Sequence, residues 1–105
     1  LTLPIMACGG DGVISVVSNC VPAGFRNCVQ NCLDENFGAG KQQFYNLLSL
    51  MRLTMAETNP IPIKSIMHQL GYCSPQVRLP LCEPTASTQK AIAEALGSIR
   101  QMELS

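Results

Sequence analysis

Cysteine and histidine are the residues of this chain with the widest range of possible chemistry. Cys28 and Cys32 stand four residues apart and would share one face of a helix, where two thiolates could chelate a metal ion. However, the chain has no CxxC spacing, and His68 is its only histidine. We therefore predict no metal site. Six cysteines in 105 residues fall below the roughly 8–10% typical of a disulfide scaffold. This favours reduced thiols that pack as small apolar residues.

Lysine is the other candidate for covalent chemistry, because an apolar pocket can lower its pKa and make the amine nucleophilic. Lys64 has the apolar neighbours Ile63 and Ile66. It belongs to a short predicted helix outside any strand, so we predict that its stem packs while its charge stays at the surface. We predict structural roles for Arg78 and for His68, which lies one helical turn after Lys64. We assign no catalytic residue to this chain.

The elements that must position any site begin with a β-branched run, GVISVV, at residues 12–17. This run is the one strong strand signal, and it is typical of a strand buried on both faces of a parallel sheet. Because side chains alternate along a strand, Ile14 would share one face with Gly12 and Val16. A single strand needs hydrogen-bonding partners, and this chain supplies none.

The rest of the pattern predicts helices separated by glycine and proline. The predicted helical ranges are residues 1–8 (the end of a helix), 22–36, 41–56, 59–71 and a last helix starting at Thr85 or Ser87. Gly38 and Gly40 are expected to separate the second range from the third. Residues 72–84, which contain three prolines, are expected to be irregular.

Composition limits the classes of function. The chain has 47% apolar residues, 13% charged residues and a formal net charge of zero. This predicts one folded domain and argues against a disordered chain, a nucleic-acid partner or a polybasic membrane surface. No apolar run reaches the roughly 18 residues of a membrane span, and no basic residue precedes the apolar start as in a signal peptide. The expected location is the cytoplasm.

Three motifs in order carry a family resemblance. They are GGDGVISV at residues 9–16, NPIPIK at 59–64 and RLPL at 78–81. Together they resemble the dihydrodipicolinate synthase family. The resemblance implies an α/β fold: the C-terminal portion of a TIM (β/α)8 barrel, followed by a C-terminal helical domain. Residues 1–37 would hold the end of barrel helix 7, strand 8 and helix 8, and residues 38–105 would form the helical domain.

The resemblance also implies a function. Such a lyase condenses pyruvate with aspartate semialdehyde through a Schiff base, in the diaminopimelate route to lysine, with no cofactor or metal and usually as a homotetramer. Its Schiff-base lysine and its proton-relay residues would lie in the remainder of the barrel, so this chain alone is expected to be inactive. A related keto-acid aldolase and a non-catalytic helical interaction module are the alternatives.

Ile14 is the one residue to which the resemblance gives a binding role, beside pyruvate. An apolar side chain near the end of a barrel strand can line the site and exclude water. Ser15 and Asn19 are the nearest polar residues, and turn formation accounts for the Ser18-Asn19 pair. We expect the strand to be an isolated piece of a barrel, neither exposed at a free edge nor paired inside a self-sufficient fold.

Overall fold

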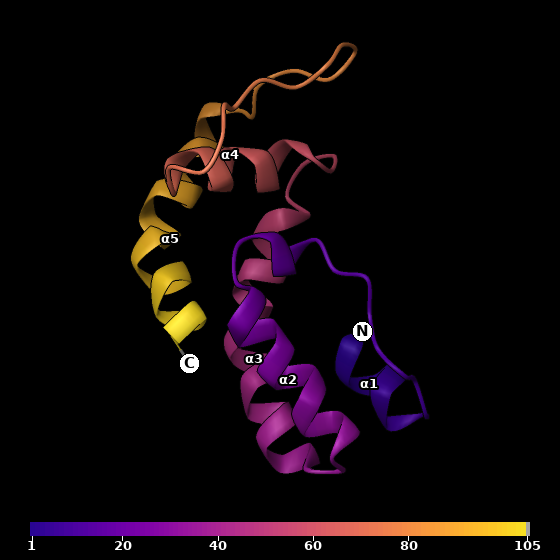
Figure 1. The fold of residues 1–105 in the computed structure, drawn as a ribbon. Coiled ribbons are helices and arrows are strands. Elements are labelled where there is room, and N and C mark those ends of the chain that lie inside the picture. Colours follow the sequence, from indigo (N-terminus) through magenta and orange to yellow (C-terminus); the bar gives the residue numbers. More distant parts are fainter. Residues whose placement is uncertain (105) are drawn as a thin grey trace.

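The computed structural model describes residues 1–104, and these form helices joined by turns and extended connections (Figure 1). The elements are α1 (Thr2–Ala7), the 3₁₀ turn η1 (Val17–Asn19), α2 (Pro22–Leu33), α3 (Phe37–Thr54), α4 (Ile61–Gln69) and α5 (Ala86–Leu104). The expected helix end at residues 1–8 is confirmed, and Gly9, at φ +99°, follows it. No helix within these residues combines the length and apolarity that crossing a membrane requires.

Helices α2 and α3 lie side by side, joined by a short turn (Figure 1). Pro22 occupies the first turn of α2, where its missing N–H costs nothing. Asn36 caps α3 by accepting a hydrogen bond from the amide of Ala39 at 3.4 Å. Helix α2 therefore ends three residues before the predicted position 36, because the turn uses residues 34–36.

The predicted break at Gly38 and Gly40 is wrong, since α3 begins at Phe37 and runs through both glycines. Gly40 is buried against α2, and a Cβ added there would meet the Cys32 sulfur at 2.8 Å. The glycine at position 40 thus allows the two helices to approach closely. In the sequence alone, a glycine with this packing role looks the same as a glycine that ends a helix.

Helices α4 and α5 complete the helical layer. Helix α4 starts after Pro60, one residue beyond the predicted cap Asn59, and ends before Gly71, whose φ is +92°. The predicted cap of the last helix is confirmed, because the Thr85 hydroxyl oxygen accepts from the Thr88 amide at 3.4 Å. Residues 72–84 form the expected irregular segment, which projects as a long loop between α4 and α5 (Figure 1).

The core lies between α2, α3, α4 and α5. Its buried apolar side chains come from every one of these helices and from the turn before α2. They are Val17, Cys20, Val21, Phe25, Cys28, Leu47, Leu50, Ile63, Ile66, Ile92 and Ile99. The predicted burial of cysteine is correct for Cys20, Cys28 and Cys32, but Cys8, Cys73 and Cys82 are exposed. The helical part from residue 17 onward therefore has a hydrophobic core of its own.

The predicted strand at residues 12–17 does not form within the described part of the chain. Residues 10–15 are an extended connection between α1 and the helical body, and Val17 already belongs to η1 (Figure 1). A strand exists only through hydrogen bonds to a neighbouring strand, and residues 1–104 provide no neighbour. The segment is exposed and belongs to no sheet within these residues, so its expected place as a piece of a barrel stays a prediction.

Candidate functional site

Ile14 lies at the middle of the extended connection, and its side chain is fully exposed, with a relative accessibility of 105%. Its neighbour Val13 is 44% exposed and, with Gly12, Phe25 and Arg26, lines a hollow of about 300 Å³ beside α2. The two neighbouring side chains thus differ in their surroundings, which is consistent with alternation along an extended chain. Within residues 1–104, nothing covers the Ile14 side chain.

A tight turn follows Ile14 and directs the chain into α2. The Ser18 hydroxyl donates to the Ser15 carbonyl oxygen at 2.8 Å, and the Ser18 amide donates to the Ser15 hydroxyl oxygen at 3.2 Å. The Asn19 side-chain amide donates to the Val16 carbonyl oxygen at 2.9 Å. These polar groups satisfy one another, which matches the turn-forming role predicted for Ser18 and Asn19.

The start of α2 carries a contact from the far end of the chain. A carboxylate oxygen of Glu103, in the last turn of α5, accepts hydrogen bonds from the amides of Ala23 at 2.9 Å and Gly24 at 3.4 Å. This contact spans about 80 residues of sequence. No short-range pattern indicates it, and the sequence analysis missed it.

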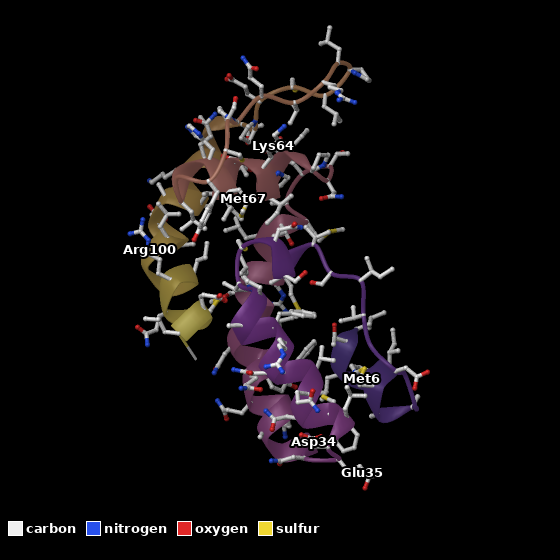
Figure 2. All side chains as sticks on the ribbon, in the orientation of Figure 1. Met6, Asp34, Glu35, Lys64, Met67 and Arg100 are labelled. Carbon is white, nitrogen blue, oxygen red and sulfur yellow. The ribbon has the colours of Figure 1, made fainter. Side chains whose placement is uncertain are left out.

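The other candidate residues lie elsewhere and do not contribute to the hollow beside Val13. Figure 2 shows Lys64 on α4, with Met67 further along the same helix. Lys64 is half-buried, in agreement with the predicted packing of its stem. The Nδ1 atom of the exposed His68 lies 2.9 Å from the carbonyl oxygen of Cys73. The exposed Arg78 lies in the projecting loop, where its carbonyl oxygen accepts from the Leu81 amide at 3.0 Å.

The buried thiols have low reactivity at neutral pH. Burial raises the pKa of Cys20 to about 11, and the carboxylate of Glu103 adds to the effect. Burial also raises the pKa of Cys28 to about 11, with a smaller contribution from Cys32. Thiolate is the nucleophilic and metal-binding form, so these shifts disfavour reactivity at neutral pH. Within residues 1–104, histidine, cysteine and acidic side chains nowhere gather in a group of three that could hold a metal.

Comparison with known proteins assigns the chain to a family. The family model described as "Dihydrodipicolinate synthetase family" matches residues 1–99. The chain belongs to the dihydrodipicolinate synthetase family. A 4-hydroxy-tetrahydrodipicolinate synthase from Methanococcus vannielii is 46% identical over 99 residues, which are 94% of this chain and 34% of that protein. The chain therefore spans about a third of the length of the curated relatives it matches.

The comparison with solved structures leads to the same family. A synthase described as the first monomeric dihydrodipicolinate synthase variant matches 92% of this chain and 32% of its own, with a TM-score of 0.89 and 32% identity. A chloride-inhibited dihydrodipicolinate synthase from Acinetobacter baumannii, in complex with pyruvate, matches 93% of this chain and 34% of its own, with a TM-score of 0.88 and 26% identity. The predicted family is thus confirmed, and the helices of this chain have the arrangement found in part of a synthase subunit.

Proposed function

We propose that this chain is the C-terminal part of a pyruvate-dependent lyase that condenses pyruvate with aspartate semialdehyde to 4-hydroxy-tetrahydrodipicolinate. The family match over residues 1–99, which includes Ile14 and the turn after it, carries the proposal. In the complete subunit, residues 1–37 would close a (β/α)8 barrel, and residues 38–105 would form the helical domain. The extended connection would become the eighth strand once strands on both sides supply hydrogen bonds.

The chemistry would start on the remainder of the barrel. A lysine amine there would attack the pyruvate carbonyl and expel water, which leaves a protonated imine. Loss of a methyl proton from the bound pyruvate would then send an electron pair toward the positive nitrogen and form an enamine. The enamine carbon would attack the aldehyde of the second substrate. Neither a metal nor an organic cofactor takes part in these steps.

Ile14 would contribute an apolar wall beside the bound pyruvate. Among the exposed large hydrophobic residues described, Ile14 has the highest relative accessibility, and it does not line the hollow beside α2. Near the C-terminal end of a barrel strand, such a side chain faces the region where substrates bind. Excluding water from that region protects the enamine from protonation by solvent.

A chimeric enzyme tests the proposal. Residues 1–99 would replace the matching segment of the Methanococcus vannielii synthase, and the condensation of pyruvate with aspartate semialdehyde would be measured. We expect an active chimera. In it, Ile14→Asp should raise the KM for pyruvate at least tenfold, because it places an anion beside the pyruvate carboxylate. The matched Ile14→Val variant, which keeps the wall apolar, should stay within a few-fold of the parent.

Borohydride trapping of pyruvate provides the complementary measurement. Residues 1–105 alone should form no reduced adduct, whereas the chimera should form one on a lysine outside the grafted segment. An adduct on Lys41, Lys64 or Lys90 would contradict the assignment of the reactive lysine to the remainder of the barrel. A folded chimera with no condensation activity would favour the keto-acid aldolase or the non-catalytic module instead.

The proposal also covers the cellular location, the thiol state and the oligomeric state of the complete protein. We expect a cytoplasmic enzyme with reduced thiols that assembles as a homotetramer. A related synthase has been described as monomeric, so the oligomeric state needs its own measurement. Light scattering of the active chimera at assay concentration would give its mass, and a monomer would remove the tetramer from the proposal.

A further inference from the structure

Asp11 and Gly12 are neighbours in the extended connection, and the proposed function does not use them. Both residues are exposed. A Cβ added at Gly12 would meet no atom within 4 Å, so the space that a side chain would fill is open. Within the described part of the chain, residues 11–14 make no backbone hydrogen bond. The backbone on both sides of the Gly12 amide can therefore rotate without breaking such a bond.

An aspartate followed by glycine can close a ring on its own backbone. The Gly12 amide nitrogen attacks the carboxyl carbon of Asp11, so a C–N bond forms and a C–O bond breaks. The carboxyl hydroxyl group and the amide proton leave as one water molecule, and the product is a succinimide. Water then opens the ring at either carbonyl group, which gives aspartate again or isoaspartate. No atom is oxidised or reduced, and isoaspartate has the same mass as aspartate.

Ring closure depends on how freely the backbone moves at this point. The amide nitrogen must approach the side-chain carboxyl carbon, so the main chain has to leave its extended conformation. A helix or a paired strand resists that rotation through its hydrogen bonds, whereas residues 11–14 have none within residues 1–104. Glycine also helps, because it adds no Cβ beside the attacking nitrogen. The Asp11–Gly12 pair therefore meets both requirements.

Asp34 is the only other aspartate of the chain, and it provides the contrast. It is also exposed, but its carboxylate oxygen accepts a hydrogen bond from the Gln30 side-chain amide at 3.0 Å. The nitrogen that would attack belongs to Glu35, and it donates to the Cys32 carbonyl oxygen at 3.1 Å. Glu35 also carries a Cβ. The two aspartates are thus alike in exposure and differ in the freedom of the backbone.

We propose that Asp11–Gly12 is a modification site at which this chain isomerises spontaneously to isoaspartate through a succinimide. Isoaspartate leaves the α-carboxyl group free, because the main chain then runs through the side-chain carbon. The modified chain is therefore a substrate for the class of methyltransferase that esterifies this group. The inference concerns the chain itself and does not rest on the proposed function.

Ageing of the 105-residue chain tests the inference. The chain would be kept at physiological temperature in mildly acidic buffer for several weeks and then cut with trypsin. Cleavage after Arg26 and Lys41 places Asp11 in the peptide 1–26 and Asp34 in the peptide 27–41. An isoaspartyl methyltransferase with a radiolabelled methyl donor would measure isoaspartate in each peptide. Label in the peptide 1–26 should grow with time and exceed that in the peptide 27–41 about tenfold.

Two variants identify the reacting groups. Gly12→Ala adds a methyl group in open space, at a backbone without a left-handed φ, and should lower the label in the peptide 1–26 about tenfold. Asp11→Glu keeps the negative charge but requires a larger ring, so it should remove the label. Circular dichroism would show that both variants keep the helical content of the wild type.

A measurement in guanidinium chloride separates the role of the fold from that of the local sequence. Unfolding should change the rate at Asp11 by no more than about twofold, because the native connection is already free to rotate. The rate at Asp34 should increase, since unfolding releases the Glu35 amide and the Asp34 carboxylate.

Three results would overturn the proposal. They are a peptide 1–26 without label, equal label in the native peptides 1–26 and 27–41, and a Gly12→Ala variant that reacts as fast as the wild type. A larger increase at Asp11 on unfolding would show that the native chain protects this site, which would also overturn it. No pyruvate is present, so failure here leaves the synthase assignment intact, and an inactive chimera leaves this result intact.

Discussion

The contact between Gly40 and Cys32 allows a quantitative test of how α2 and α3 pack. A methyl group at position 40 would lie 2.8 Å from the Cys32 sulfur, whereas the next nearest atom, the Cys28 carbonyl oxygen, would be at an ordinary 3.6 Å. Overpacking of this kind costs about 1–3 kcal/mol. Alanine in a helix gains about 1 kcal/mol over glycine. For Gly40→Ala we therefore expect a net loss of about 1 kcal/mol in the free energy of unfolding.

The same helix offers a matched control. Gly38 lies in α3 two residues earlier, and a Cβ there would meet nothing within 4 Å. Gly38→Ala should therefore stabilise the chain by up to about 1 kcal/mol, since it keeps only the helix-propensity gain. Urea unfolding, followed by circular dichroism, would measure both variants. The two midpoints should move in opposite directions from the wild type.

A double-mutant cycle tests whether the contact with the Cys32 sulfur causes the loss of stability in Gly40→Ala. Cys32→Ala removes the sulfur, so adding Gly40→Ala to that background should cost less than it costs in the wild type. We expect a coupling energy of about 1 kcal/mol between positions 32 and 40. A stabilised Gly40→Ala variant, or a coupling energy near zero, would refute the close approach of the two helices at this point.

Further predictions concern titration and accessibility. Ellman's reagent should modify three thiols on the native chain and all six after unfolding. The three accessible thiols are Cys8, Cys73 and Cys82. The folded pKa values of Cys20 and Cys28 are raised from 9.0 to about 11, so their contribution to stability is complete below pH 9 and is lost as the pH rises toward 11. The free energy of unfolding obtained from urea titrations across this range should fall by about 1–2 kcal/mol per thiol, and Cys20→Ala should reduce the fall. Hydrogen bonds from Thr88 and Thr85 lower the pKa of Glu57, so Glu57→Gln should melt at a lower temperature than the wild type at pH 7. That difference should disappear as acid protonates Glu57, and a difference independent of pH would contradict the assigned bonds.

The sequence was sufficient for the parts of the fold that depend on local signals. Apolar periodicity located α3, α4 and α5, and the hydroxyl of Thr85 indicated the start of α5. These signals act within one or two turns of a helix, so they can be read from a window of residues. Gly40 misled the prediction, because a glycine that terminates a helix and a glycine that allows close packing look alike without the facing sulfur.

The candidate site was less predictable, because its contacts are long-range. The contact of Glu103 with Ala23 and Gly24 joins opposite ends of the sequence, and no periodicity encodes such a pair. The β-branched run predicted a strand that does not form within residues 1–104, because a strand needs hydrogen bonds from neighbouring strands and these residues supply none.

The extended connection before α2 also affects how the isolated chain behaves at high concentration. Its residues 11–14 make no backbone hydrogen bond within the described part of the chain, the side chains of Val13 and Ile14 are exposed, and Asp11 is the one charged residue between positions 9 and 17. Such a stretch has little to prevent strand addition from a second molecule. Self-association through intermolecular β-structure, growing with protein concentration and suppressed by Ile14→Lys, is therefore the expected behaviour of the isolated chain.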